Sequence, residues 1–368
     1  MSRTIGLVTG GGDAPGLNAV IRAVVKTAVN EFGWRVKGIE DSFEGLLGET
    51  HVRELKPADV RGLLPRGGTI LGTRNRGNFV VREENGQQVK PESVYREAIS
   101  NLERLGIDGL IVLGGEGTLA IASEFDRLGV PVIGVPKTID NDLAATELTF
   151  GFVTALDIAT EALDRLHTTA ESHDRVMLLE VMGRHAGWIA LHSGVSGGAD
   201  VILIPEIPFS METVAEKVLQ RERCDSQFSI IVVAEGASEA GKAELYVDTK
   251  DQRLGGIGNY CSAEIGRLTG KEARCVVLGH LQRGGSPNAF DRMLATNFGA
   301  CATRALERGE RGVMVALQAA NIVTVPLEDA LENIKTVSPD SQLVRTARDV
   351  GISFGSPPEA AHHKEENC

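Results

Sequence analysis

The sequence has few cysteines, prolines and aromatic residues, and these scarcities exclude several classes of protein. Its 368 residues include 5 cysteines, 13 prolines and 4% aromatic side chains. The cysteines are widely spaced and form no CxxC pair, which argues against a structural zinc site or a disulfide-rich secreted scaffold. We therefore expect five free thiols in a reducing compartment. The 42% hydrophobic content is typical of a globular chain rather than a disordered one.

Long apolar runs and an excess of positive charge are also missing. No apolar run reaches the length of a membrane span, and the opening residues, MSRTIGLVTG, carry no signal-peptide pattern. The formal net charge of −12 argues against a general binder of nucleic acids or anionic membranes. We expect a cytoplasmic protein without nucleic-acid or membrane partners, in which any phosphate site is local.

The apolar residues that are present form short runs that end in glycine or polar residues. These runs lack alternation and are rich in β-branched residues, which predicts strands buried on both faces of a parallel sheet. Segments with helical spacing lie between them, at 18–32, 92–106 and 154–167. The expected strands lie at 4–9, 108–115, 130–136, 175–183, 199–206, 228–236 and 273–280. The pattern predicts two doubly wound, Rossmann-like α/β domains with mainly parallel sheets and an active-site cleft between them.

Two glycine-rich turns join predicted strands to helices. Glycines let backbone N–H groups approach a phosphate, and a helix N-terminus adds partial positive charge. The first turn, at 10–16, fits this role or that of a tight turn with no ligand. The second, LGGEGTLAIA at 113–122, carries Glu116, whose carboxylate is a suitable Mg²⁺ ligand beside a phosphate.

Two further glycine motifs resemble known nucleotide-binding patterns and suggest other functions. Gly115, Gly117 and Ala120 fit a GxGxxA fingerprint, which keeps an NAD-type oxidoreductase open as an alternative. The next strand, however, ends in proline and lysine rather than in an acid for the ribose. The sequence GASEAGKA at 236–243 has P-loop spacing but lacks the Ser/Thr and the following helix, so we interpret it as a chance match.

The stretch TIDND at 138–142 places acids directly after a predicted strand. In extended backbone, side chains two residues apart point the same way, so Asp140 and Asp142 are expected to share one site. Two such carboxylates suit a general base and a partner that orients water or Mg²⁺. A solvated turn is the alternative.

Phosphate-type donors cluster at other strand ends. Arginine forks suit bidentate contacts with phosphate, and a carboxylate can accept sugar hydroxyls. Each residue alone also fits a surface ion pair. The candidates are Arg175, Arg184, Glu235, Arg274, His280 and Arg283. These residues indicate an Mg²⁺-dependent enzyme that acts on phosphorylated sugars or nucleotides.

Several motifs together resemble the 6-phosphofructokinase family, in the family's order and over most of the chain. They are GGDAPGLNAVIR, RGGTILGT, GGEGT, PKTIDND, MGRHAGWIA and GHLQRGGSPNAFDR. The resemblance implies phosphoryl transfer to the 1-hydroxyl of fructose 6-phosphate. It also implies a nucleotide-binding domain at 1–151 plus about 282–332, a sugar-phosphate domain at about 152–281 plus 333–354, and a flexible tail at 355–368.

The resemblance assigns roles to individual residues. Asp140 matches the general base, with Thr138 and Asp142 beside it, and Arg184 steadies the transferring phosphoryl group. Glu116 takes the position of the Mg²⁺ ligand. The implied sugar-phosphate contacts are Thr138, Ile139, Asp140, Arg175, Met182, Gly183, Arg184, Glu235, Arg274, His280, Leu281, Gln282 and Arg283. The implied nucleotide contacts are Gly11, Gly12, Asn75, Arg76, Gly115, Glu116, Gly117 and Thr118.

Two positions in the family diagnose the phosphoryl donor, and here they disagree. Gly117 leaves room for the α-phosphate of ATP, whereas Lys137 is typical of pyrophosphate users. We give Gly117 more weight, because steric and charge exclusion is the more direct discriminator. The expected donor is therefore ATP. A pyrophosphate-dependent enzyme with the same acceptor is the first alternative, and a non-catalytic nucleotide sensor is an alternative from another class of protein.

One departure from the family pattern and one feature of assembly remain. Asn75 stands where the family often has an arginine that bridges both substrates, so Arg74 or Arg76 is expected to substitute. In the family, the arginines matching Arg175 and Arg274 reach the sugar phosphate of a neighbouring subunit, which implies a homodimer or homotetramer.

Overall fold

The computed structural model describes residues 2–75, 77–79, 82–84, 87–89, 91–248 and 253–356. These form two compact units. Unit 1 comprises the described residues within 2–139, 143–154 and 283–334, and unit 2 comprises those within 140–142, 155–282 and 335–356. The sequence-based boundary had placed 140–142 in the first domain; the structure groups them with unit 2, where the Lys335 backbone N–H donates to the Asp142 carbonyl at 2.8 Å.

Unit 1 is built on an eight-stranded sheet in the order β16-β15-β7-β6-β1-β2-β3, with β8 paired to β7. Its core strands are parallel, and the pairs β2–β3 and β15–β16 are antiparallel. The strands are β1 (Thr4–Thr9), β2 (Arg35–Ile39), β3 (Val52–Leu55), β6 (Leu110–Gly114), β7 (Val132–Thr138), β8 (Phe150–Gly151), β15 (Val313–Gln318) and β16 (Asn321–Pro326). A separate hairpin joins β4 (Arg82–Glu84) to β5 (Gln87–Val89).

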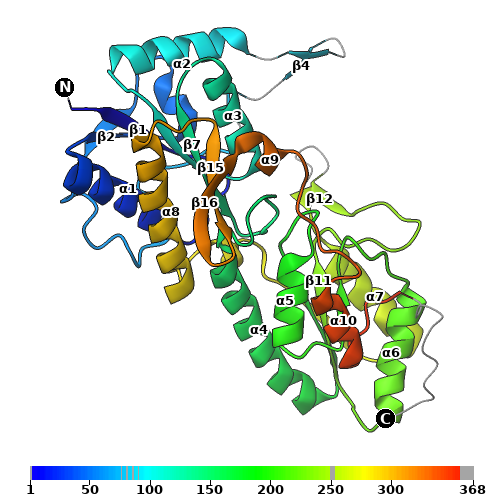
Figure 1. The fold of residues 1–368 in the computed structure, drawn as a ribbon. Coiled ribbons are helices and arrows are strands. Elements are labelled where there is room, and N and C mark those ends of the chain that lie inside the picture. Colours follow the sequence, from blue (N-terminus) through cyan, green and yellow to red (C-terminus); the bar gives the residue numbers. More distant parts are fainter. Residues whose placement is uncertain are drawn as a thin grey trace. The chain divides into compact units, whose positions relative to one another are not determined.

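Helices cover both faces of this sheet. The unit 1 helices are α1 (Leu17–Phe32), η1 (Ser42–Leu46), α2 (Glu92–Arg104), α3 (Glu116–Arg127), α8 (Ala289–Glu307) and α9 (Leu327–Leu331). One apolar core lies under α1 and α8, which run side by side (Figure 1). A second core lies under α2, α3 and α9 on the opposite face. The apolar strands are therefore buried from both sides, as their lack of alternation predicted.

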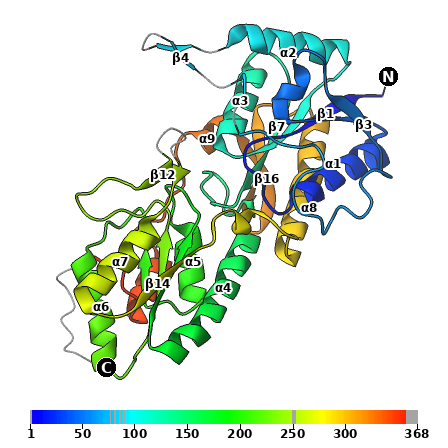
Figure 2. The ribbon, with the colours of Figure 1, turned by 180° about the vertical axis from the view of Figure 1, so that it is seen from behind.

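Unit 2 contains a four-stranded parallel sheet in the order β10-β11-β9-β14. Its strands are β9 (Val176–Val181), β10 (Val201–Leu203), β11 (Ser229–Ala234) and β14 (Ala273–Val277), with a small hairpin of β12 (Tyr246–Asp248) and β13 (Arg253–Leu254). Its helices are α4 (Phe152–His173), α5 (Trp188–Ser196), α6 (Met211–Arg223), α7 (Ile257–Thr269), η2 (Gly279–Arg283) and α10 (Gln342–Asp349). The boundary between the units falls within the first turn of α4. Helix α7 packs on β9 and β14, and α6 lies beside it (Figure 2).

The fold confirms the predicted α/β class with mainly parallel sheets. All seven expected strands are present, but the expectation of burial on both faces is wrong for β14. That strand is at the sheet edge, and Val276 and Val277 are exposed. A short apolar run looks alike in a central strand and in an edge strand, so periodicity could not separate the two.

Two further expectations concerned the cysteines and the absence of a membrane-spanning segment. Cys261, Cys275 and Cys301 are free thiols, as expected, whereas Cys224 is disulfide-bonded, so the expectation is wrong for that residue. Wide spacing of cysteines in a sequence does not by itself exclude a disulfide. None of the helices in the described ranges combines the length and apolar character that crossing a bilayer requires.

Candidate active site

Three strands of unit 1 end at the same edge of the sheet. The register pairs Thr9 of β1 with Leu113 of β6, and Gly114 of β6 with Pro136 of β7. The strand order reverses between β1 and β6, since β2 lies next to β1 on one side and β7 lies next to β6 on the other, and α1 and α3 therefore cover opposite faces. Ligands of open α/β sheets bind at such a switch point. Both glycine-rich turns predicted from the sequence lie there.

The first turn brings backbone close to side chains from its neighbours. A Cβ on Gly10 would lie 2.6 Å from Cγ2 of Thr118, and Gly11 has a φ of +75°. A larger residue would thus clash or be strained at these positions. The Gly11 N–H already donates to the Arg74 carbonyl at 3.0 Å. Gly11 therefore allows a ligand to come close to the backbone, but its own N–H is already used within the protein.

Lys137 places a buried positive charge beside this turn. The side chain, on β7, is 3% exposed, and its Nζ donates to the Gly12 carbonyl. The same Nζ would lie 3.3 Å from a Cβ on Gly11. The next residue, Thr138, is also buried, and its carbonyl accepts from the Thr149 hydroxyl at 2.7 Å. An ammonium so placed suits the binding of a phosphate at the turn.

The second turn begins α3 with an exposed carboxylate. Gly115 is the N-cap, Glu116 is the first helical residue, and no side chain caps the helix. A Cβ on Gly114 would lie 2.3 Å from the Thr118 Cβ, so packing requires glycine there. A Cβ on Gly117 would meet no atom of the described residues within 4 Å. Packing of the protein itself therefore does not explain Gly117.

Arginines of unit 1 occupy the surroundings of the first turn. Arg283 donates to the Asp13 carbonyl at 3.3 Å, and its Nη1 would lie 3.0 Å from a Cβ on Gly12. Arg74 forms an exposed ion pair with Asp41 at 3.7 Å, and Asn75 is exposed. The predicted contact at Arg76 lies outside the described residues.

In unit 2, the ends of β9 and β11 bring four predicted residues together. Glu235 accepts from the Arg184 backbone N–H at 3.2 Å, directly beside Met182 and Gly183. Gly183 has a φ of +147° and Arg184 one of +51°. Such backbone in a non-glycine residue is rare and clusters at functional sites.

Gln282 joins this cluster from η2. Its Oε1 accepts from the Met182 N–H at 2.8 Å, and the side chain is fully buried. Within the described part of the chain, its Nε2 has no hydrogen-bond partner. A buried donor without a partner costs free energy unless a ligand or water uses it. The neighbouring His280 and Leu281 are exposed.

The acidic turn at 140–142 is ordered by a distant lysine. Lys335 Nζ donates to Asn141 Oδ1 at 3.0 Å, across 194 positions of sequence. Asn141 has a φ of +52°, so the extended backbone assumed for Asp140 and Asp142 is absent, and that part of the argument for one shared site fails. Asp140 is 3% exposed, and a buried Oδ1 of Asp142 has no hydrogen-bond partner in the described ranges. No local pattern in the sequence could have identified Lys335.

Arg175 and Arg274 lie together, but at the other end of the unit 2 strands. Both bind the exposed Glu272: Arg175 Nε lies 2.8 Å from Oε2, and Arg274 Nη2 lies 2.5 Å from Oε1. The contact with Arg175 first, and then the positive charges of Arg175 and Arg274, lower the pKa of Glu272. Strand β9, of six residues and about 20 Å, separates them from Met182. One subunit therefore does not place these arginines beside its own Met182–Arg184 loop.

The fold and its strand-end clusters define a two-unit α/β protein of the kind that takes phosphate-bearing ligands at a switch point. The chain belongs to the phosphofructokinase family, whose profile matches residues 4–306.

The names of similar proteins specify two different phosphoryl donors. The chain is 60% identical over 351 residues to the ATP-dependent 6-phosphofructokinase of Chloroflexus aurantiacus, covering 95% of this chain and 97% of that one. It is 51% identical over 358 residues to the pyrophosphate–fructose 6-phosphate 1-phosphotransferase of Streptomyces coelicolor, covering 95% and 99%. Among solved structures, phosphofructokinase from Pichia pastoris matches with a TM-score of 0.78 and 35% identity, covering 90% of this chain and 38% of that chain.

Proposed function

We propose that this chain is an ATP-dependent 6-phosphofructokinase, which transfers the terminal phosphoryl group of ATP to the 1-hydroxyl of fructose 6-phosphate in the cytoplasm. The products are fructose 1,6-bisphosphate and ADP. The observation that carries the proposal is the switch point of unit 1, where two glycine turns, the Lys137 ammonium and the Glu116 carboxylate meet three strand ends. Phosphoryl transfer depends mainly on such positioning and charge neutralisation.

The open space at Gly117 supports ATP as the donor. Gly117 is the second residue of α3, and glycine has a lower helix propensity than any residue except proline. Among the described residues, no atom within 4 Å of a Cβ there accounts for the glycine, unlike at Gly114. A ligand that needs the space explains the glycine, and the α-phosphate of ATP, absent from pyrophosphate, is such a ligand.

Lys137 keeps pyrophosphate as the second candidate donor. Its buried ammonium beside Gly12 suits a compact, highly charged donor. The purified protein should be assayed with fructose 6-phosphate and Mg²⁺, with ATP and pyrophosphate supplied separately. We expect a higher kcat/KM with ATP; faster turnover with pyrophosphate would reverse the assignment, and no turnover with either would reject the proposed activity.

Asp140 is the proposed general base. A buried carboxylate held in an ordered turn can take the proton of the sugar 1-hydroxyl as the new bond forms. Thr138 and Asp142 orient the hydroxyl and water, and Arg184 stabilises charge on the transferring group. The remaining proposed sugar contacts are Ile139, Met182, Gly183, Glu235, His280, Leu281, Gln282 and Arg283. The proposed nucleotide contacts are Gly11, Gly12, Asn75, Arg76, Gly115, Glu116, Gly117 and Thr118.

Glu116 fits a magnesium ion held partly by phosphates. The described residues contain no group of three or more His, Cys, Asp or Glu side chains that could enclose a metal. Mg²⁺ commonly keeps several waters and uses one or two carboxylates plus substrate phosphates, so a single exposed carboxylate at the glycine turn suits it. When bound, the ion would neutralise charge on the phosphates. Glu116 would hold and orient it.

The positions of Arg175 and Arg274 support a homodimer or homotetramer with a shared sugar-phosphate site. They lie about 20 Å along β9 from the Met182–Arg184 loop of the same chain. A neighbouring subunit can supply the same pair to that loop, as in an isologous contact. The guanidinium pair would then bind the 6-phosphate.

A further inference from the structure

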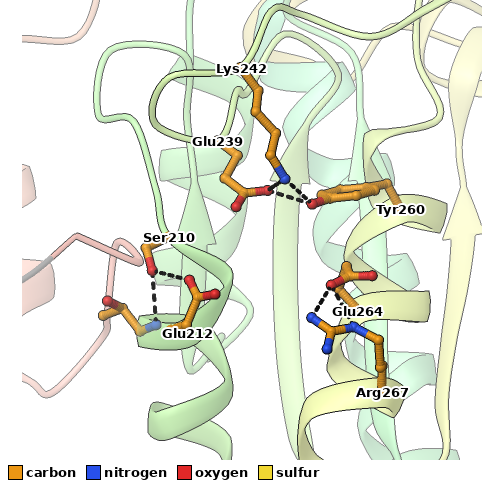
Figure 3. Close-up of polar contacts among 8 residues, drawn as sticks. Ser210, Glu212, Glu239, Lys242, Tyr260, Glu264 and Arg267 are labelled. Carbon is orange, nitrogen blue, oxygen red and sulfur yellow. Dashed lines mark hydrogen bonds and ion pairs between the residues drawn. The ribbon is translucent and has the colours of Figure 1, made fainter.

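The loop that follows β11 contains the P-loop-like motif, and the phosphate sites described above do not use it. Its lysine, Lys242, donates to Glu239 at 2.9 Å and to the Tyr260 hydroxyl at 2.8 Å (Figure 3). The Tyr260 hydroxyl in turn donates to Glu239 at 2.5 Å. These hydrogen bonds, first the one to Tyr260 and then the one to Glu239, raise the pKa of Lys242. The lysine thus attaches the loop to α7.

The same loop contacts the sugar loop, which we define as residues 182–185, at three points. Glu235 accepts from the Arg184 N–H at 3.2 Å. A Cβ on Gly236 would lie 1.9 Å from the Arg184 carbonyl, so the two backbones are in close contact. Further along, Glu244 Oε1 lies 3.1 Å from His185 Nδ1, and Tyr246 donates to the other oxygen of Glu244 at 2.8 Å.

The sugar loop needs such external support. Arg184 has a φ of +51°, and in a non-glycine residue this conformation persists only when surrounding contacts impose it. Within residues 236–246, backbone bonds add rigidity: Ala240 donates to the Phe209 carbonyl at 2.8 Å, and Lys242 to the Glu239 carbonyl at 2.9 Å. The segment is therefore fixed independently of the sugar loop that it contacts.

We propose that residues 236–246 form a brace that positions the sugar loop for fructose 6-phosphate, with Glu244 and His185 as its positioning pair and Glu239, Lys242 and Tyr260 as its anchor. The inference rests on the proposed function for its substrate. None of these five residues is assigned a contact with the reacting atoms; they act through Arg184 and its neighbours. The motif that resembles a P-loop is thus a structural tether in this chain.

A double-mutant cycle on the pair tests the brace. We expect Glu244→Ala and His185→Ala each to raise KM for fructose 6-phosphate by roughly two- to five-fold, the range for an exposed polar pair, and to lower kcat by no more than that factor because Arg184 also contacts the transferring group, with the donor KM nearly unchanged. The double variant should be no worse than either single one, because both remove the same interaction. Glu244→Gln, which keeps an acceptor for His185, should show a smaller effect. Unchanged sugar KM in both single variants, or fully additive effects, would overturn the pairing.

The anchor offers a matched comparison on one helix. Tyr260→Phe removes the hydroxyl that binds Glu239 and Lys242, and should raise the sugar KM in the same way. Glu264→Gln breaks the ion pair with Arg267, 2.7 Å long and one turn further along α7 (Figure 3), without touching the brace, and should leave the KM unchanged. Equal effects of the two changes would contradict the proposed tether.

Hydrogen exchange separates this inference from the proposed activity. Amides of residues 182–186 should exchange faster in Glu244→Ala than in the wild-type protein, whether or not the protein turns over fructose 6-phosphate. An inactive wild type with faster exchange in the variant would reject the activity and retain the brace. An active wild type with identical exchange would reject the brace.

Discussion

Asp140 is the residue on which the proposed chemistry most depends. It is buried and follows Thr138 and Ile139 at the end of β7. Asp140→Asn keeps the size of the side chain but removes a base, so we expect kcat to fall by about 10²- to 10⁴-fold. Because the base acts in the transition state, KM for fructose 6-phosphate should change much less. Steady-state kinetics with both substrates varied would measure the two effects, and retained turnover would remove Asp140 from the role of base.

Gly117 is the residue that separates the two donors. Gly117→Asp adds a carboxylate where a Cβ meets no atom of the described part of the chain within 4 Å, so folding should be little affected. The added negative charge should repel the α-phosphate and lower kcat/KM for ATP by on the order of 10²-fold. Turnover with pyrophosphate should fall less.

Gly114→Ala is the matched control for this change. A Cβ there would lie 2.3 Å from the Thr118 Cβ, so this variant should lose thermal stability, as measured by Tm. If Gly117→Asp instead lowers Tm as much as Gly114→Ala does, the space at Gly117 is needed for folding and not for a donor.

At the scale of one element, α5 should give the protein a measurable pH dependence. Burial, and then the charge of Lys335, lower the pKa of His192 in this helix. The folded state therefore favours the neutral imidazole, and the unfolded chain binds more protons below its ordinary pKa near 6.5. The stability from neutral His192 is complete above that pH and is lost as the pH falls below it.

His192→Gln tests this dependence, since the amide does not titrate. Between about pH 7 and pH 5, the Tm of the variant should fall less than the Tm of the wild type. The difference should begin as the pH falls below the ordinary histidine pKa. Thermal unfolding followed by circular dichroism at several pH values would measure it. Parallel curves for the two proteins would assign the acid sensitivity to other groups.

Elements differ in how well the sequence predicts them. Buried parallel strands such as β6 and β11 appear as unbroken apolar runs, and the turns after β1 and β6 carry glycines that sterics require. The edge position of β14 and the antiparallel pairing of β16 depend on which strand lies alongside, which is a tertiary property.

The candidate site shows the same limit. The sequence motifs placed Met182, Arg184 and Glu235 near one another through strand ends that fold side by side, and the structure brings them together. Two other residues act through contacts between positions far apart in the chain. Lys335 orders the Asp140 turn. Asn18 donates to the Arg66 carbonyl at 3.0 Å and supports the loop after it. Their residue types fit many surface or core roles, so no local pattern predicts these contacts.

At the scale of the whole molecule, the proposed shared site can be tested by mixing inactive subunits. Asp140→Asn removes the base of a subunit's own site, whereas Arg274→Ala removes a phosphate contact that we assign to its neighbour's site. In a hybrid dimer of the two variants, one site carries both defects and the other carries neither. Co-expressed chains with different affinity tags, purified through both tags, should therefore regain roughly half of the wild-type activity per dimer at low fructose 6-phosphate.

The two homo-oligomeric variants, assayed under the same conditions, are the controls. Arg274→Ala alone should mainly raise the sugar KM, which is why low substrate gives the clearest contrast. If each site were built from one chain, every site in the hybrid would carry one defect, and the mixed dimer would be no more active than the average of its parents. That outcome would assign Arg175 and Arg274 to the exposed ion-pair cluster around Glu272 and not to the sugar phosphate of a second subunit.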